Sequence, residues 1–314
     1  MNNSNIWNKE LAPVKEFKIG LIADEASKNL DEAAALAKYF GASGLEIRTA
    51  FGKQLVDLTE EDILQIKQIL AKHNMVCCGI GSPFFKCKPE EADEHLKTLD
   101  QYIAIAKELN TNKIRGFAFW RSDECSLDDM LPIIKEKLTE VAKKLRAANM
   151  ILVLENEPST YDTDAAATAK IIKEVNLPEI QALWDPGNDT YAYTREIPYP
   201  DGYNALRPYI QHIHIKDSKR NENDKAISVR FGDGSVNYTE QFACLSNEGY
   251  VGWLVLEPHY YRESSPLSEK TVVDLKHLEL TGGMRSTAEC FEQFIAFLSE
   301  QGYFIKNKKQ PHKL

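Results

Sequence analysis

Four short apolar segments in the second half of the chain each end in a side chain that can bind a metal ion. They cover residues 151–155, 180–185, 210–214 and 253–257. Each segment is Leu-rich or β-branched and is bounded by Pro, Gly or charged residues, which is typical of a buried parallel strand. A Glu, an Asp, a His and a Glu at the ends of four consecutive strands can converge on one divalent cation.

Alternation along these strands supports the cation site, because alternate residues of a strand point to opposite faces. Val255 and Glu257 share one face of the last segment, and Val153 and Glu155 share one face of the first. His212 and His214 also share a face, so alternation alone does not separate them. His214 lies nearer the strand end and is the better candidate for the ligand.

A single Glu or Asp after a strand is commonly a helix cap, and a single His is usually a core or surface residue. Three carboxylates at one cluster of strand ends, however, would repel one another unless a cation or protonation offset their charge. Three carboxylates and one imidazole suit Mn²⁺, Mg²⁺, Co²⁺ or Zn²⁺. We therefore expect one divalent metal ion, with these ligands: Glu155, Asp185, His214 and Glu257.

Other polar residues near the predicted strand ends are candidates for substrate binding. Glu46 and Arg48 share one face at the end of a second strand, where Arg48 either binds substrate or pairs with Glu46. Trp120 follows the fourth strand and would suit a polyol or a phosphate. Lys216 lies on the inward face of the seventh strand, as does His212, and could act as an electrophile or a base. A structural ion pair is the alternative for Lys216.

Strand and helix patterns alternate along the whole chain. Four further strands are expected at residues 17–23, 44–47, 75–80 and 113–119, and helices follow the strands up to a last helix at 287–301. Eight β-then-α units without a linker predict a single closed (β/α)8 TIM barrel of the α/β class. An open doubly wound sheet usually has a Gly-rich turn after its first strand, and residues 23–28 contain no Gly.

Three segments fall outside the barrel pattern. We expect an N-terminal extension at 1–15, the barrel domain at 16–305 and a basic C-terminal tail at 306–314. The connection after the eighth strand, about 260–286, is too long for a routine loop and is predicted to be a lid or a substrate wall.

Composition and charge limit the classes of molecule that the protein is expected to bind. The formal net charge of -9 and the pI of about 5.4 disfavour a nucleic-acid partner. The six cysteines show no spacing of a disulfide or zinc framework, which favours reduced thiols. No signal peptide or membrane-spanning run is present, so we expect a cytoplasmic protein without a membrane partner. A homo-oligomer is compatible with the sequence, which does not indicate one.

The strand-end motifs resemble the xylose isomerase-like barrel superfamily of sugar and sugar-phosphate isomerases and epimerases. The matching stretches are residues 154–158 (LENEP), 184–188 (WDPGN), 212–217 (HIHIKD) and 256–258 (LEP), with 232–234 (GDG) before the last unit. The eight-unit layout extends the resemblance to nearly the whole chain. The resemblance implies the same four metal ligands. Because the family uses the second His of the His-x-His pair, it also implies that His214, and not His212, is the ligand.

The resemblance also implies a reaction on a small carbohydrate. In the family's ketose epimerases the two glutamates, here Glu155 and Glu257, are both ligands and the acid/base pair that moves a proton through a metal-bound enediolate. Arg220 matches an arginine that holds substrate hydroxyls. Two positions depart from these epimerases, since Asn188 stands where they carry a His and Tyr161 where they carry a second Glu. Asn188 remains a candidate for substrate binding.

Three other functions compete with a sugar isomerase or epimerase. A carbon–oxygen lyase of the inosose-dehydratase type would use the same metal site, and Lys216, common among related dehydratases, would then be central. An endonuclease IV-like DNA-repair enzyme would need a zinc site rich in histidines, and the third and fourth strands supply none. A non-catalytic protein that binds a sugar or a metal is the last alternative.

Overall fold

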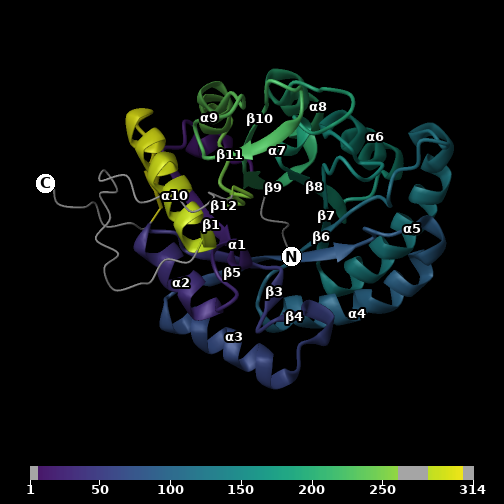
Figure 1. The fold of residues 1–314 in the computed structure, drawn as a ribbon. Helices are drawn as coiled ribbons and strands as arrows, with labels where there is room; N and C mark the ends of the chain where they lie inside the picture. Colours follow the sequence, from purple (N-terminus) through teal and green to yellow (C-terminus); the bar gives the residue numbers. More distant parts are fainter. Residues whose placement is uncertain (1–5, 261–281, 307–314) are drawn as a thin grey trace, which may run out of the picture.

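A closed barrel of parallel strands forms the centre of the molecule (Figure 1). The computed structural model describes residues 6–260 and 282–306. Within these residues each of eight strands pairs in parallel with the next, and the last strand pairs with the first to close the barrel. In barrel order they are β1 (Glu16–Ile22), β2 (Gly44–Ile47), β5 (Val76–Phe84), β6 (Lys113–Gly116), β7 (Ile151–Glu155), β8 (Ile180–Trp184), β9 (Ile210–Ile215) and β12 (Trp253–Leu256).

Helices surround this barrel on the outside (Figure 1). The single (β/α)8 TIM barrel predicted from the sequence is therefore confirmed. The main helices are α2 (Leu30–Tyr39), α3 (Glu60–Lys72), α4 (Ala92–Glu108), α5 (Leu127–Ala148), α6 (Ala165–Val175), α8 (Tyr203–Leu206), α9 (Tyr238–Asn247) and α10 (Gly282–Glu300). Two short helices, α1 (Ala23–Ala26) and α7 (Pro186–Asp189), follow β1 and β8 directly.

The alternation of strand faces separates two apolar regions. Leu152 and Leu154 of β7 belong to the large core between the barrel and its helices. Val153, on the opposite face, packs with Ile151 and Leu183 in a small cluster on the other face of the strands. The predicted orientation of these faces holds, so the residues that share Val153's face, Glu155 among them, point toward the barrel axis.

Helix α5 begins with a reciprocal cap that the sequence specifies. The backbone N–H of Asp129 donates to the Ser126 hydroxyl (3.2 Å), and the N–H of Ser126 donates to the Asp129 carboxylate (3.3 Å). Each bond satisfies a donor that the first turn would otherwise leave unpaired.

Removing this cap is expected to destabilise the barrel measurably. Ser126→Ala should lower the free energy of unfolding by about 1 kcal/mol, because the Asp129 N–H loses its acceptor. Urea denaturation followed by circular dichroism measures the change. Thr139→Ala, which removes a hydroxyl that bonds the Lys135 carbonyl within the same helix, is the matched control and should change stability by less than about 0.5 kcal/mol. Equal effects of the two substitutions would contradict a capping role.

The strand ends differ in places from the sequence prediction. The fourth strand was expected to run through residue 119, but β6 ends at Gly116, and Phe119 has a φ of 65°, which no strand accommodates. The third strand is longer than expected and ends at Phe84. A hairpin of β10 (Asp217–Arg220) and β11 (Ala226–Val229) after β9 was not predicted, and β13 (Phe304–Ile305) adds to β1.

The described part of the N-terminal extension packs at the N-terminal end of β12. The Val251 N–H donates to the Ile6 carbonyl, and the Asn8 N–H donates to the Gly249 carbonyl, each at 2.7 Å. Gly249 has a φ of 78°, and a Cβ there would meet the Asn8 carbonyl oxygen at 2.1 Å, so the contact requires glycine. Most of the predicted lid and of the basic tail, residues 261–281 and 307–314, lies outside the described residues.

Two further features bear on the expected partners and redox state. The six cysteines are free, and none is paired in a disulfide. No helix in the described ranges has the length and apolarity to cross a membrane.

Candidate metal centre

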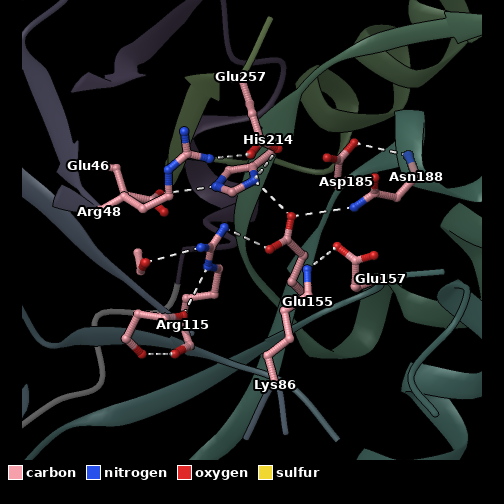
Figure 2. A network of polar contacts seen from close by, with 12 residues as sticks. Glu46, Arg48, Lys86, Arg115, Glu155, Glu157, Asp185, Asn188, His214 and Glu257 are labelled. Atoms are coloured by element: carbon pink, nitrogen blue, oxygen red, sulfur yellow. Dashed lines mark hydrogen bonds and ion pairs between the residues drawn. The ribbon is translucent and has the colours of Figure 1, made fainter. Parts of the chain in front are cut away.

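Four side chains from four neighbouring strands meet at the C-terminal end of the barrel. Glu155 ends β7, Asp185 follows β8, His214 lies in β9 and Glu257 follows β12. One ligand atom from each lies within 4.8 Å of all the others, and all four residues are buried. The carboxyl ends of parallel strands meet at this face of the barrel, which is why residues far apart in the sequence can share one centre. Figure 2 shows the group around His214.

His214 is held in the orientation that a metal ligand needs. Its Nε2 lies 3.1 Å from a carboxylate oxygen of Glu46, which accepts the proton of Nε2. Its Nδ1 lies 3.3 Å from Glu155 Oε1 and 3.3 Å from Glu257 Oε2, and it is buried without a hydrogen-bond partner. A proton fixed on Nε2 leaves the lone pair of Nδ1 directed at the carboxylates, where a cation would sit.

Asp185 uses its two oxygens differently. Oδ1 accepts the backbone N–H groups of Gly187 (2.8 Å) and Asn188 (3.3 Å) and so caps α7. Oδ2 is buried and lacks a well-directed hydrogen bond, although the Lys216 ammonium lies 2.6 Å away. Burial, opposed by Lys216, raises the pKa of Asp185 to about 7. A divalent cation would stabilise the ionised form of this carboxylate.

The two glutamates are arranged alike. Glu155 turns Oε1 toward His214 and Oε2 toward the guanidinium of Arg115, which is 2.9 Å away. Glu257 turns Oε2 toward His214 and Oε1 toward Arg48, at 3.4 Å. Burial would raise the pKa of both carboxyls, but Arg115 for Glu155 and Lys216 for Glu257 outweigh it and lower each pKa below its ordinary value. Both glutamates are therefore ionised at neutral pH, as ligands and bases must be.

The donor set fits a divalent cation. Burial opposes the charged form of His214, but Glu46 and then Glu257 outweigh it and raise its pKa, so a bound cation would take the place of the Nδ1 proton. Three carboxylates and this imidazole supply hard and borderline ligands, and one ligand atom of each lies within 4.8 Å of the others. The structure thus brings together the ligand set predicted from the sequence, and Glu46 adds the outer contact that fixes His214.

A cavity of about 760 Å³ opens onto this centre. Glu155 and Glu257 form part of its wall, and the predicted residues Asn188, Arg48 and Lys216 line it as well. Asn188 donates from Nδ2 to the Asn156 carbonyl at 2.9 Å and lies 3.5 Å from Glu155. The rest of the wall includes Lys86, Arg115, Phe117, Tyr191, Ser228 and His259.

Four residues predicted to bind substrate do not reach this cavity wall. Glu46 and His212 are buried beside each other, with His212 Nε2 2.8 Å from Glu46, because His212 lies two residues before His214 along β9 and so deeper in the barrel. Trp120 is 45% exposed and lies outside the cavity. Arg220 lies in the β10–β11 hairpin, where its guanidinium donates to the Asp224 carbonyl.

Arg115 and His259 are site residues that the sequence reasoning did not select. Arg115 lies two positions after Lys113 in β6, on the inward face, so the alternation rule that identified Glu155 would also have identified it. Arg115 Nη2 donates to the Gly81 carbonyl, which fixes the guanidinium beside Glu155. His259 has a φ of 44° and lies 3.1 Å from Glu25, a contact that no strand pattern could have indicated.

The contact between Glu46 and His214 makes a prediction about metal affinity. Glu46→Gln is expected to weaken binding of the divalent ion by about 10–100-fold, because an amide oxygen holds His214 less firmly and lowers the basicity of Nδ1. Isothermal titration with Mn²⁺ measures this. Glu179→Gln, which removes a carboxylate paired with the distant Arg146, is the control and should leave the Mn²⁺ affinity unchanged. Unaltered affinity in Glu46→Gln would show that Glu46 does not position the ligand.

The chain is similar to proteins of one barrel family over most of its length. The model of the family described as xylose isomerase-like TIM barrel matches residues 34–281. Among curated proteins, 3-dehydroshikimate dehydratase of Bacillus anthracis is 24% identical over 131 residues, which is 40% of this chain and only 44% of that protein. Inosose dehydratase 1 of Bacillus cereus is 21% identical over 231 residues, covering 66% of this chain and 76% of that protein.

Solved structures share the fold over almost the full length. The 3-keto-D-glucoside 4-epimerase from E. coli has a TM-score of 0.66 and 18% identity, covering 91% of this chain and 100% of that one. A xylose isomerase-like TIM barrel protein from Mycobacterium smegmatis, in complex with magnesium, has a TM-score of 0.64 and 17% identity, covering 94% and 99%. At these identities the likeness shows a common fold.

Proposed function

The chain belongs to the xylose isomerase-like TIM barrel family, and we propose that it is a divalent-metal-dependent sugar or sugar-phosphate isomerase or epimerase. The observation that carries the proposal is the paired arrangement of Glu155 and Glu257. Each glutamate turns one oxygen toward the centre and the other toward an arginine, and both form part of one cavity wall. The similarity of the fold to a sugar epimerase supports the same interpretation.

The chemistry follows from what these residues can do. A divalent ion such as Mn²⁺, Mg²⁺, Co²⁺ or Zn²⁺ would polarise the substrate carbonyl and stabilise the negative charge of an enediolate. One glutamate takes the proton next to the carbonyl and the other returns a proton to the opposite face. Arg115 and Arg48 hold the two carboxylates in place and keep them ionised before substrate binds. Asn188 and the hydrogen-bonded pair of Tyr191 and Ser228 offer partners for substrate hydroxyls.

A carbon–oxygen lyase is the second candidate, and one contact favours it. The Lys216 ammonium lies within 3.2 Å of oxygens of both Asp185 and Glu257, close enough to the centre to donate a proton to a departing hydroxyl. The two curated relatives are dehydratases. The lyase shares the first step with the epimerase, since both begin when a glutamate removes a proton beside a carbonyl. The reactions differ in what leaves afterwards.

One experiment separates the two functions. The Mn²⁺-loaded protein is incubated in D₂O with panels of ketoses, ketose phosphates and inososes, and products are read by mass spectrometry and by configuration. A product with one solvent deuterium and the mass of its substrate otherwise unchanged identifies the isomerase or epimerase. A product that has lost one water identifies the lyase. If no compound in either panel exchanges a proton or loses water, the proposed chemistry is wrong for these substrates.

A further inference from the structure

A second cavity, of about 560 Å³, lies at the opposite end of the barrel from the metal centre. Its wall is formed at the N-terminal ends of β1, β2, β5 and β12 and by the turns that precede them. Lys18, Lys38 and Lys306 line it together with Trp253. Lys113, the first residue of β6, is half-buried at the same end of the barrel. We call the four lysines at positions 18, 38, 113 and 306 the lysine mouth.

The inner lysines of this group lack carboxylate neighbours among the described residues. Burial, and then Lys306, lower the pKa of Lys18. Burial also lowers the pKa of Lys113, and Lys18 adds to that effect. The charged groups among the described residues that act on these two ammonium groups are other lysines, because burial raises the pKa of the Cys78 thiol and keeps it neutral. This is unusual in a chain with a net charge of -9, where the cations at the metal centre all face carboxylates.

Ordinary structural roles do not account for the cluster. Lys38 stands in the last turn of α2, where a cation interacts favourably with the helix dipole. Lys18 and Lys113 belong to strands, and Lys306 follows β13, so none of these three lies at a helix end. Lys18 and Lys113 are half-buried, whereas Lys38 and Lys306 are exposed at the rim of the same end of the barrel. Half-buried ammonium groups are seldom left without an anion to offset their charge.

The aromatic wall of the cavity is held in a fixed position. The Lys18 ammonium lies 5.5 Å from the centre of the Trp253 ring. The indole packs so closely on Gly44 that a Cβ at that position would meet the ring at 2.7 Å. A rigid indole beside several ammonium groups provides an apolar surface next to a strongly positive one.

We propose that the lysine mouth binds a small phosphate-bearing molecule. A phosphate group offers two negative charges and several acceptor oxygens, which match ammonium groups brought together from different elements. The volume is within the range of pockets for small organic ligands. Its entrance is separate from the cavity of the metal centre, because no residue lines both. The two ends of the barrel would then bind different molecules.

Equilibrium binding tests the proposal directly. Isothermal titration of the full-length protein with inorganic phosphate and with AMP, in the presence of EDTA, excludes binding through a metal ion at the other end. Lys18→Gln and Lys306→Gln should each weaken binding by about tenfold or more, since each removes a charge-assisted hydrogen bond. The control is Lys143→Gln, which removes the same charge from an exposed position on α5 and should bind as the wild type does.

The outcomes distinguish the sources of phosphate. Tighter binding of AMP than of phosphate identifies an organic phosphate that uses the Trp253 surface, and equal affinities identify free phosphate. The proposal is overturned if neither ligand binds saturably, or if Lys143→Gln weakens binding as much as the other variants. It is also overturned if a short single-stranded RNA binds to the lysine mouth while AMP does not.

Thermal stability provides a second measurement that does not depend on titration heats. Lys113→Met should raise the melting temperature without phosphate, because it removes a poorly compensated cation from a half-buried place. Addition of about 10 mM phosphate should raise the melting temperature of the wild type more than that of Lys113→Met. Equal phosphate shifts in the two proteins would contradict a role for Lys113 in holding the anion.

Discussion

Glu257→Gln is expected to lower the turnover of the sugar substrate by about 10²–10⁴-fold, the range that a positioned acid or base contributes. Glutamine keeps the size of the side chain and one oxygen, but its amide cannot accept a proton from carbon at neutral pH. In the structure Glu257 lies 3.3 Å from His214 Nδ1 through one oxygen and 3.4 Å from Arg48 through the other. The substitution thus changes the proton chemistry without opening a large space.

The measurement must separate lost proton transfer from lost metal, because Glu257 is expected to do both tasks. Metal content is measured on the same sample, and turnover is compared at saturating Mn²⁺. Deuterium incorporation from D₂O reports the proton step itself. Glu155→Gln should behave in the same way. Glu179→Gln, which removes a carboxylate paired with the distant Arg146, should exchange deuterium at the wild-type rate. Product formation that continues without deuterium exchange would point to a hydride shift between carbons.

The convergence of the four side chains at the candidate metal centre could be predicted because its signal lies in strand ends, which the sequence shows clearly. Glu155, Asp185 and Glu257 each follow an apolar run directly, and the fold requires consecutive parallel strands to end at one face. The sequence did not by itself separate the two imidazoles, since the side chains of His212 and His214 lie on the same face of β9. The structure shows their difference as one of depth, with His214 at the carboxylate cluster and His212 against Glu46.

The substrate side of the cavity was harder to predict because loops build much of it. Arg220 was expected to hold substrate hydroxyls because of the family resemblance, but a hairpin after β9 carries it to Asp224. The sequence 217–229 has no pattern strong enough to show that turn. Glu46 was assigned to substrate because it is charged and lies at the end of a strand, yet Glu46 accepts hydrogen bonds from two buried histidines. A charged residue at a strand end can therefore hold a metal-binding side chain in position, and it need not contact the substrate.

Lys216→Met is expected to lower turnover by about 10²-fold or more while the protein still binds its metal ion. The ammonium lies 2.6 Å from Asp185 Oδ2 and 3.2 Å from Glu257 Oε2, so under the proposed chemistry it would lie where charge develops. All four ligands remain in this variant, and a cation that competes for two of them is removed. Mn²⁺ affinity should therefore stay the same or rise, which titration of the variant measures.

The same variant also separates the two candidate reactions, because they need Lys216 at different steps. If the lysine donates a proton to a departing hydroxyl, Lys216→Met should lose dehydration and still exchange the proton beside the carbonyl with D₂O. In an epimerase, where Lys216 stabilises the charge formed by proton removal, exchange and product formation should fall together.

Lys86→Met is the matched control, since it removes a cation from the cavity wall where Lys86 pairs with Glu157 at 2.8 Å. It should raise KM more than it lowers kcat. Equal kcat losses in both variants would mean that total cavity charge, and not the position of Lys216, controls the rate.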